Sequence, residues 1–253
     1  MSILVIIPAY NEAENLPHVL PRLRQYLPEA DILVVDDHSQ DATATVARRL
    51  GAKILRLPNN LGYGGAVQTG FRYAAQRGYD YGIMMDADGQ HDPASVPDLL
   101  APVLAGSADL ALGSRFTGSM TYHASPVRRL GMRLFAFLAS LLTGQTITDA
   151  TSGFQAMTGE VMAFFAEENY PSDYPDADTI LMLHYAGFRI REVPVTMHSR
   201  LSGKSMHGNS LKALYYIAKM LLSMTIVYFR YRTHAGTVRL RVDPALEGTI
   251  SES

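Results

Sequence analysis

Residues 3–8 have the sequence ILVIIP, an unbroken apolar run that ends at a proline. Such a run, without alternating polar residues, is typical of a strand buried on both faces of a sheet. Similar short runs recur along the first half of the chain, separated by helical patterns. The patterns predict strands at residues 3–7, 31–36, 53–57, 81–85 and 109–112, and helices at residues 12–26, 41–50, 64–76 and 93–104. This alternation predicts an α/β fold with a mostly parallel sheet and flanking helices.

The second half of the chain is less regular and is predicted to add a C-terminal helical annex. Leucine and phenylalanine recur at helical spacing over residues 127–142, and helices are also expected at residues 177–185 and 211–231. Residues 189–198 resemble a strand that Pro194 interrupts.

We divide the chain into three segments on these patterns. Residues 1–205 are expected to form the catalytic domain, and residues 206–232 an amphipathic helix that is a candidate for a membrane surface. Residues 233–253 are expected to be a partly disordered tail, because they are polar and terminal.

Composition excludes several classes of protein. The 253 residues are 47% hydrophobic and 18% charged, which is a globular balance, and the net charge of -2 does not favour nucleic acid as a partner. The absence of cysteine excludes disulfides and thiolate metal sites. The longest nearly apolar stretch, residues 220–229, is too short to span a bilayer, and no signal peptide is expected. We therefore expect a protein that is soluble or binds at a membrane surface.

Acidic residues follow three of the predicted strands. Asp36 and Asp37 follow the second strand, Asp86 and Asp88 follow the fourth, and Glu12 follows the first. Ligands of open parallel sheets bind beyond the carboxyl ends of the strands. Carboxylates two residues apart at a strand end point the same way and repel unless a cation lies between them. Because Mg2+ and Mn2+ prefer oxygen ligands, Asp86 and Asp88 indicate a metal-diphosphate site; the alternative is a solvated acidic loop.

Two glycine-containing motifs carry less weight. Gly62-Tyr63-Gly64-Gly65 precedes a helix, but it lacks the spacing of a dinucleotide-binding loop, so a tight turn into the helix is an equal interpretation. Gly203-Lys204-Ser205 resembles the end of a phosphate-binding loop, but the earlier glycine is missing and no strand precedes it.

Six short motifs occur along the chain. They begin at Pro8, Val35, Asp86, Gly113, Thr151 and Arg200, and read PAYNE, VDDHS, DADGQH, GSRF, TSGF and RLSGKS. Together they resemble the inverting family 2 glycosyltransferases, in the branch of dolichyl-phosphate mannose synthases and polyprenyl-phosphate glycosyltransferases. The resemblance covers residues 3–230, and the motifs occur in the family's order.

The resemblance implies a GT-A fold and a nucleotide-sugar donor. The residues that would contact the donor nucleotide are Pro8, Tyr10, Glu12, Asp37 and Asp86. Asp86, Asp88 and Gln90 would hold Mg2+ or Mn2+ against the donor diphosphate, where the metal acts as a Lewis acid. The sequence does not separate GDP-, UDP- and dTDP-linked donors.

The acceptor implied by the resemblance is a polyprenyl phosphate, which needs positioning and charge neutralisation rather than a strong general base. Candidates to bind its phosphate are Arg115, Arg129, Arg200 and Lys204, with Arg128 as a replacement for Arg129. Asp149 would orient the acceptor or the metal-bound phosphate, or it caps a loop. Asp88, Arg115 and Asp149 are the candidate catalytic residues.

Two other functions remain alternatives. A family 2 transferase with a soluble hydroxyl acceptor would need a general base, which Asp149 or Asp178 would have to supply. The other alternative is a nucleotide-binding module without catalytic activity.

The two long helices of the annex are candidates for membrane contact. Residues 127–142 and 211–231 combine basic residues with apolar faces, so they suit a membrane interface; alternatively they pack on the domain or form a dimer interface. We expect a peripheral protein at the cytosolic face of a membrane, where nucleotide sugars are made, with a homo-oligomer left open.

Overall fold

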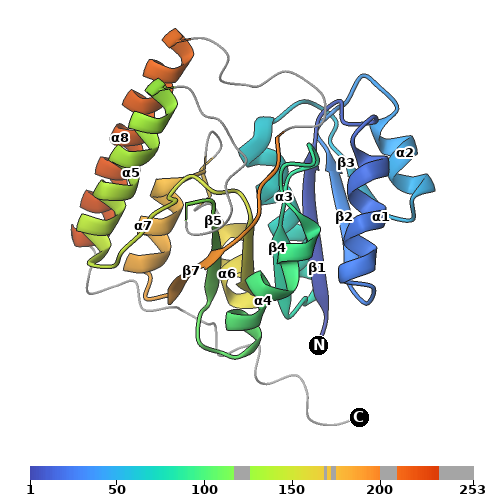
Figure 1. The fold of residues 1–253 in the computed structure, drawn as a ribbon, viewed down its shortest axis with the longest axis horizontal. Helices are drawn as coiled ribbons and strands as arrows, with labels where there is room; N and C mark the ends of the chain where they lie inside the picture. The colour runs from blue at the N-terminus through green and yellow to red at the C-terminus, as the bar shows by residue number, and fades with distance from the viewer. Residues whose placement is uncertain (117–125, 168–169, 172–174, 200–209, 234–253) are drawn as a thin grey trace.

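The computed structural model describes residues 1–116, 126–167, 170–171, 175–199 and 210–233 (Figure 1). The strands of these residues form one seven-stranded sheet in the order β3-β2-β1-β4-β6-β5-β7. Their bounds are β1 Ile3–Ala9, β2 Asp31–Asp36, β3 Lys53–Arg56, β4 Tyr81–Met84, β5 Leu110–Ser114, β6 Gln155–Thr158 and β7 Ile190–Pro194. The predicted fold class, a mostly parallel sheet with flanking helices, is confirmed.

Helices cover both faces of the sheet. The helices are α1 Leu16–Tyr26, α2 Thr43–Arg49, α3 Gly62–Arg77, α4 Val96–Leu104, α5 Pro126–Thr143, α6 Gly159–Ala166, α7 Ala177–Tyr185 and α8 Ser210–Thr233. Alternate residues of β1 face opposite layers: Val5 packs in the core with α1, α2 and α4, whereas Leu4 and Ile6 pack with α3 and α6. Every residue of β1 is buried, as its unbroken apolar sequence predicted.

A third layer covers the β5 and β7 side of the sheet. Helices α5, α7 and α8 bury a separate cluster that includes Phe135 of α5, Leu181 of α7 and Met224 of α8. Figure 1 shows α5 and α8 alongside each other at the edge of the molecule, and the Phe135 and Tyr216 rings are 5.6 Å apart. Within the described part of the chain, no helix has the length and apolar character needed to cross a membrane.

Strand β6 was not predicted, and it runs antiparallel to both of its neighbours, β4 and β5. Its four residues have no apolar run that would distinguish them from a loop. An antiparallel strand begins at the edge where its parallel neighbours end. The loop that precedes β6 therefore lies at the carboxyl edge of the sheet, beside the segments that follow β4 and β5.

Helix α6 was also not predicted, and the other differences concern boundaries. Pro8 was expected to end the first strand, but β1 continues to Ala9. The pairing of β1 with β4 stops at Ile6, so Pro8 lies where β4 requires no N–H donor. Helix α1 begins at Leu16 rather than residue 12, after a turn in which Asn11 has a φ of 56°.

Candidate active site

The loops after β1 and β2 hold each other in place at the carboxyl edge. The backbone N–H of Asn11 donates to Ser39 Oγ at 2.9 Å, and the Asn11 side-chain oxygen accepts from the Gln40 N–H at 2.8 Å. The Glu12 N–H donates to Thr43 Oγ1 at 2.9 Å. These side-chain bonds fix the relative position of two loops that belong to different strands.

The residues expected to line the nucleoside pocket differ in exposure. Pro8 is buried within β1, Tyr10 is 48% exposed, and the Glu12 carboxylate accepts a hydrogen bond from the Asn15 amide. The Asp37 carboxylate accepts the N–H groups of Leu61 at 2.7 Å and Gly62 at 2.9 Å. Asp37 therefore satisfies backbone donors at the start of α3.

The Asp37 carboxylate is buried, and its pKa is raised from the usual value. Burial raises its pKa, and the two backbone donors oppose that rise. Its neighbour Asp36 is fully buried; Asp36 Oδ1 accepts from the Ser39 N–H at 2.9 Å, and Oδ2 lies 3.3 Å from Arg56 Nε. The motif after β2 thus combines structural hydrogen bonds with a partly desolvated negative charge.

Asp86 and Asp88 lie just beyond the end of β4, as predicted. Asp86 Oδ1 accepts from the Tyr63 hydroxyl at 2.9 Å, and Asp88 Oδ1 accepts from the Gln90 N–H at 2.9 Å. Burial and the Asp86 carboxylate raise the pKa of Tyr63 well above its usual value, so this hydroxyl remains a donor. The Gln90 side chain instead approaches the carbonyl oxygen of His198, at 3.5 Å.

The donor set at this edge fits a cation that is shared with a substrate. Among the described residues, no group of three or more His, Cys, Asp or Glu side chains could hold a metal by itself. Mg2+ is commonly held by one or two carboxylates, with phosphate oxygens and water completing its coordination. Asp86 and Asp88 supply the two carboxylates, and Asp88 is nearly fully buried.

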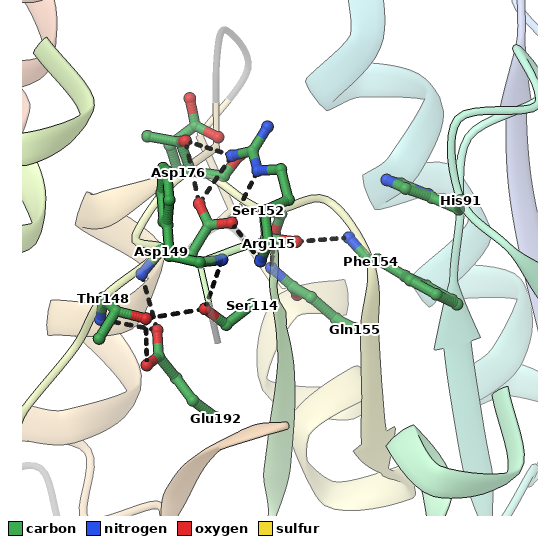
Figure 2. Close-up of polar contacts among 12 residues, drawn as sticks. His91, Ser114, Arg115, Thr148, Asp149, Ser152, Phe154, Gln155, Asp176 and Glu192 are labelled. Atoms are coloured by element: carbon green, nitrogen blue, oxygen red, sulfur yellow. Dashed lines mark hydrogen bonds and ion pairs between the residues drawn. The ribbon is translucent and has the colours of Figure 1, made fainter. Parts of the chain in front are cut away.

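Arg115 and Asp149 form a buried ion pair at the end of β5 (Figure 2). Arg115 Nε donates to Asp149 Oδ2 and one terminal nitrogen donates to Oδ1, both at 2.7 Å. The Arg115 backbone N–H also donates to Asp149 Oδ2, at 3.0 Å, and Thr151 accepts from the same guanidinium. The structure therefore brings together two of the predicted catalytic residues and fixes the orientation of the guanidinium.

Glu192 of β7 holds the loop that carries Asp149 (Figure 2). Its Oε1 accepts the N–H groups of Thr148 at 2.8 Å and Asp149 at 2.7 Å, and its Oε2 accepts from the Thr148 hydroxyl at 2.8 Å. The Thr148 hydroxyl is also 2.7 Å from Ser114 Oγ. We did not predict Glu192, because its role depends on a contact between residues more than 40 positions apart.

Two acidic residues at the start of α7 connect this helix to α8. The Tyr216 hydroxyl donates to Asp176, and the Ser223 hydroxyl donates to Asp178 Oδ2 at 2.5 Å. Asp178 Oδ1 accepts from the N–H groups of Asp176 and Thr179, so its side chain satisfies backbone donors in the first turn of α7. Burial raises the pKa of both carboxyls, that of Asp176 to about 6.

The remaining predicted phosphate-binding residues are not brought to this cluster by any described contact. Arg129 is exposed on α5. Arg200 and Lys204 lie outside the described residues, as does the side chain of Arg128. Their assignment stays a prediction.

Comparison with known proteins identifies relatives over most of the chain. The family model described as Glycosyl transferase family 2 matches residues 4–164. An undecaprenyl-phosphate mannosyltransferase of Micrococcus luteus is 37% identical over 213 residues, covering 81% of this chain and 87% of that protein. A polyprenol monophosphomannose synthase of Mycolicibacterium smegmatis is 36% identical over 232 residues, covering 85% of each chain.

Solved structures confirm the GT-A fold. Glucosyl-3-phosphoglycerate synthase from Mycobacterium tuberculosis, in complex with Mn2+ and uridine-diphosphate-glucose, matches with a TM-score of 0.65 and 20% sequence identity. The match covers 90% of this chain and 78% of that chain. At this identity the similarity concerns the fold.

The Arg115–Asp149 pair yields a prediction about stability. Asp149→Leu should lower the free energy of unfolding by about 3–5 kcal/mol, because it leaves the Arg115 charge buried without its carboxylate. The double variant Arg115→Met with Asp149→Leu should be more stable than Asp149→Leu alone, since no charge is then stranded. Urea unfolding measures both. Lys53→Met, which removes an exposed ion pair with Asp31, is the control and should cost under about 1 kcal/mol. Equal losses in Asp149→Leu and the control would contradict this interpretation.

The raised pKa of Asp176 yields a prediction about pH. The folded protein binds a proton on Asp176 more tightly than the unfolded chain does, so the stability of the wild type should fall as pH rises from about 4 to about 6. Asp176→Asn keeps an acceptor for Tyr216 and cannot ionise. Its stability relative to the wild type should therefore increase by about 1–3 kcal/mol between pH 4.5 and pH 7.5. Urea unfolding at the two pH values tests this, and a difference that does not change with pH would refute it.

Proposed function

The chain belongs to glycosyl transferase family 2, and from this we propose that it transfers a sugar from a nucleotide-sugar donor to a polyprenyl phosphate, with inversion at the anomeric carbon. The observation that carries the proposal is the pair of relatives that are 36–37% identical over more than four-fifths of the chain. Both are named for mannosyl transfer to a polyprenyl-type lipid phosphate.

At the donor end, the proposal assigns Asp86 and Asp88 to a divalent cation, Mg2+ or Mn2+, that neutralises the diphosphate of the leaving nucleotide. The solved relative with Mn2+ and uridine-diphosphate-glucose supports this assignment by its fold. Tyr10, Glu12, Asp37 and Gln90 are proposed to complete the donor site. The loops that carry Tyr10 and Glu12 are fixed by their hydrogen bonds to the loop after β2.

At the acceptor end, an oxygen of the lipid phosphate attacks the anomeric carbon while the bond to the nucleoside diphosphate breaks. That oxygen is already anionic at neutral pH, so no proton has to be removed. Arg115 is proposed to orient the acceptor phosphate, assisted by Arg129 or Arg128 and by Arg200 and Lys204. Asp149 acts through Arg115, since its carboxylate oxygens accept hydrogen bonds from that residue.

The hydrogen bonds made by Asp149 and Asp178 favour a lipid phosphate acceptor over a soluble hydroxyl acceptor. A hydroxyl acceptor would require a general base, and the two candidates were Asp149 and Asp178. The Asp149 carboxylate is paired with the Arg115 guanidinium. Both oxygens of Asp178 accept hydrogen bonds, from backbone N–H groups and from Ser223. A phosphate acceptor is compatible with these contacts because it needs no base.

Helices α5 and α8 are proposed to rest on the membrane that holds the lipid acceptor. On α5 the exposed apolar residues are Leu130, Leu134, Phe137 and Leu141, and on α8 they include Tyr215, Leu222, Ile226 and Phe229. In each helix these positions recur every three, four or seven residues, which places them along one face. Neither helix contains an acidic residue, whereas α5 has three arginines and α8 has two lysines and two arginines. An apolar face with a positive charge suits an anionic bilayer surface.

The proposed reaction is tested with purified protein, Mn2+, a short polyprenyl phosphate and labelled GDP-, UDP- and dTDP-sugars. Label should enter the organic phase with one donor class, and EDTA should prevent it. Asp88→Ala should lower the rate by about 100-fold or more. Asp80→Ala is the control, because Asp80 precedes β4 and lies at the opposite edge of the sheet. Nucleotide binding without transfer to lipid would indicate a soluble acceptor or a binding module instead.

Membrane contact is tested by flotation with vesicles that contain anionic lipid. The wild type should float with them, and binding should weaken as salt rises. A variant with Leu141→Gln and Phe229→Gln should bind at least about tenfold more weakly, since two apolar side chains no longer enter the lipid. Leu104→Gln on α4 is the matched control. If the double variant binds like the control, this surface does not contact lipid; if it instead disrupts a dimer, the surface belongs to a second copy.

A further inference from the structure

His91 forms an unusual contact with the first residue of its own motif. The chain turns after Asp86 and returns, so that His91 Nδ1 accepts the backbone N–H of Asp86 at 3.0 Å. The His91 side chain is nearly fully buried. The imidazole therefore holds the backbone of a proposed cation ligand from a position five residues further along the chain.

This hydrogen bond determines which nitrogen of the neutral ring carries the proton. A backbone N–H can only donate, so Nδ1 is the acceptor and the ring proton lies on Nε2. His91 Nε2 is 3.8 Å from Asp86 Oδ2, which is too long for a hydrogen bond but close enough for electrostatic attraction. The other carboxylate oxygen, Asp86 Oδ1, accepts from Tyr63. The Asp86 carboxylate thus lies between two groups that present hydrogen to it.

Phe154 stacks on one face of the His91 ring and fixes its orientation (Figure 2). The two rings stack with centroids 4.7 Å apart and an angle of 7° between their planes. Phe154 is fully buried, and the backbone of His91 pairs with Met197 in an isolated antiparallel bridge. The ring consequently has little freedom to rotate away from Asp86.

Gly153, in the same loop as Phe154, lies close to Tyr63 and Asp86. A Cβ atom added to Gly153 would lie 2.9 Å from the Tyr63 hydroxyl and 3.7 Å from Asp86 Oδ2. A side chain at this position would force the Tyr63 hydroxyl to shift, whereas its distance from Asp86 would be an ordinary van der Waals contact. The segment before β6 therefore lies beside Tyr63 and Asp86 at Gly153 and stacks on His91 through Phe154.

We propose that His91 is a positioning residue for the divalent cation: it fixes the backbone and carboxylate of Asp86, and Phe154 fixes the His91 ring. The inference rests on the proposed function, because it takes Asp86 to be a ligand of the cation. Groups that orient the ligands of a metal typically change its affinity by 10–100-fold when they are removed. A histidine that merely filled space would affect stability without a specific effect on the cation.

Two variants separate these roles. His91→Phe keeps a flat ring against Phe154 but has no acceptor for the Asp86 N–H. His91→Asn loses the stacked ring but keeps an acceptor oxygen close to the position of Nδ1. Phe165→Leu is the control, because it truncates a buried side chain of the core beneath α3 and α6 and should lower the melting temperature without touching the site.

The measurement is the Kd for Mn2+ in the presence of a nucleoside diphosphate, followed by electron paramagnetic resonance, together with the melting temperature of each variant. His91→Phe should raise the Kd by about 10–100-fold, His91→Asn should stay within about threefold of the wild type, and Phe165→Leu should leave the Kd unchanged. A wild-type Kd in His91→Phe, or a Kd that follows the melting temperature across all three variants, would overturn the inference alone. If the wild type itself binds no Mn2+, both the inference and the proposed cation site fail.

Discussion

The buried ion pair between Arg115 and Asp149 is the interaction on which the proposed acceptor side of the site depends. Arg115 directly follows β5, whereas Asp149 lies in the loop before β6, and β7 supplies Glu192 to hold that loop. A charged guanidinium is costly to bury unless its partners are well placed. The hydrogen bonds from Glu192 provide that placement, so three strands have to be in register before Arg115 reaches its observed orientation. The orientation of the proposed phosphate-binding arginine and the local stability of the fold thus depend on the same contacts.

The sequence predicted the parts of the fold that depend on local patterns. The apolar runs located the parallel strands, and the predicted fourth strand placed Asp86 and Asp88 at its carboxyl end. The resemblance to a known family added Arg115 and Asp149. Strand β6 was missed because its four residues carry no periodic signal, and its antiparallel direction depends on the strands beside it.

The supporting residues could not be predicted for a similar reason. Glu192 resembles any polar residue of an edge strand until the contacts with Thr148 and Asp149 are known. His91 lies within a recognisable motif, but its stacking on Phe154 joins segments 63 residues apart in sequence. Tyr63 was placed in a tight turn before the helix, but it lies in the first turn of α3. Its hydroxyl reaches Asp86 because α3 packs on β1, the strand next to β4. Long-range packing, rather than residue type, gives these side chains their positions.

The order of these elements along the chain has a consequence for how such an enzyme diversifies. The carboxylates and loops of the proposed donor side come from residues 1–92, whereas Arg115, Asp149, Glu192 and helices α5 and α8 come from later segments. Under the proposed function, a recombination event or a laboratory chimera that exchanges the later segments would alter the acceptor while retaining the nucleotide sugar. In such a hybrid, the two parts of the chain would meet where Gly153 lies beside Asp86 and where Phe154 stacks on His91. The residues at these two places would have to fit each other for the hybrid to be active.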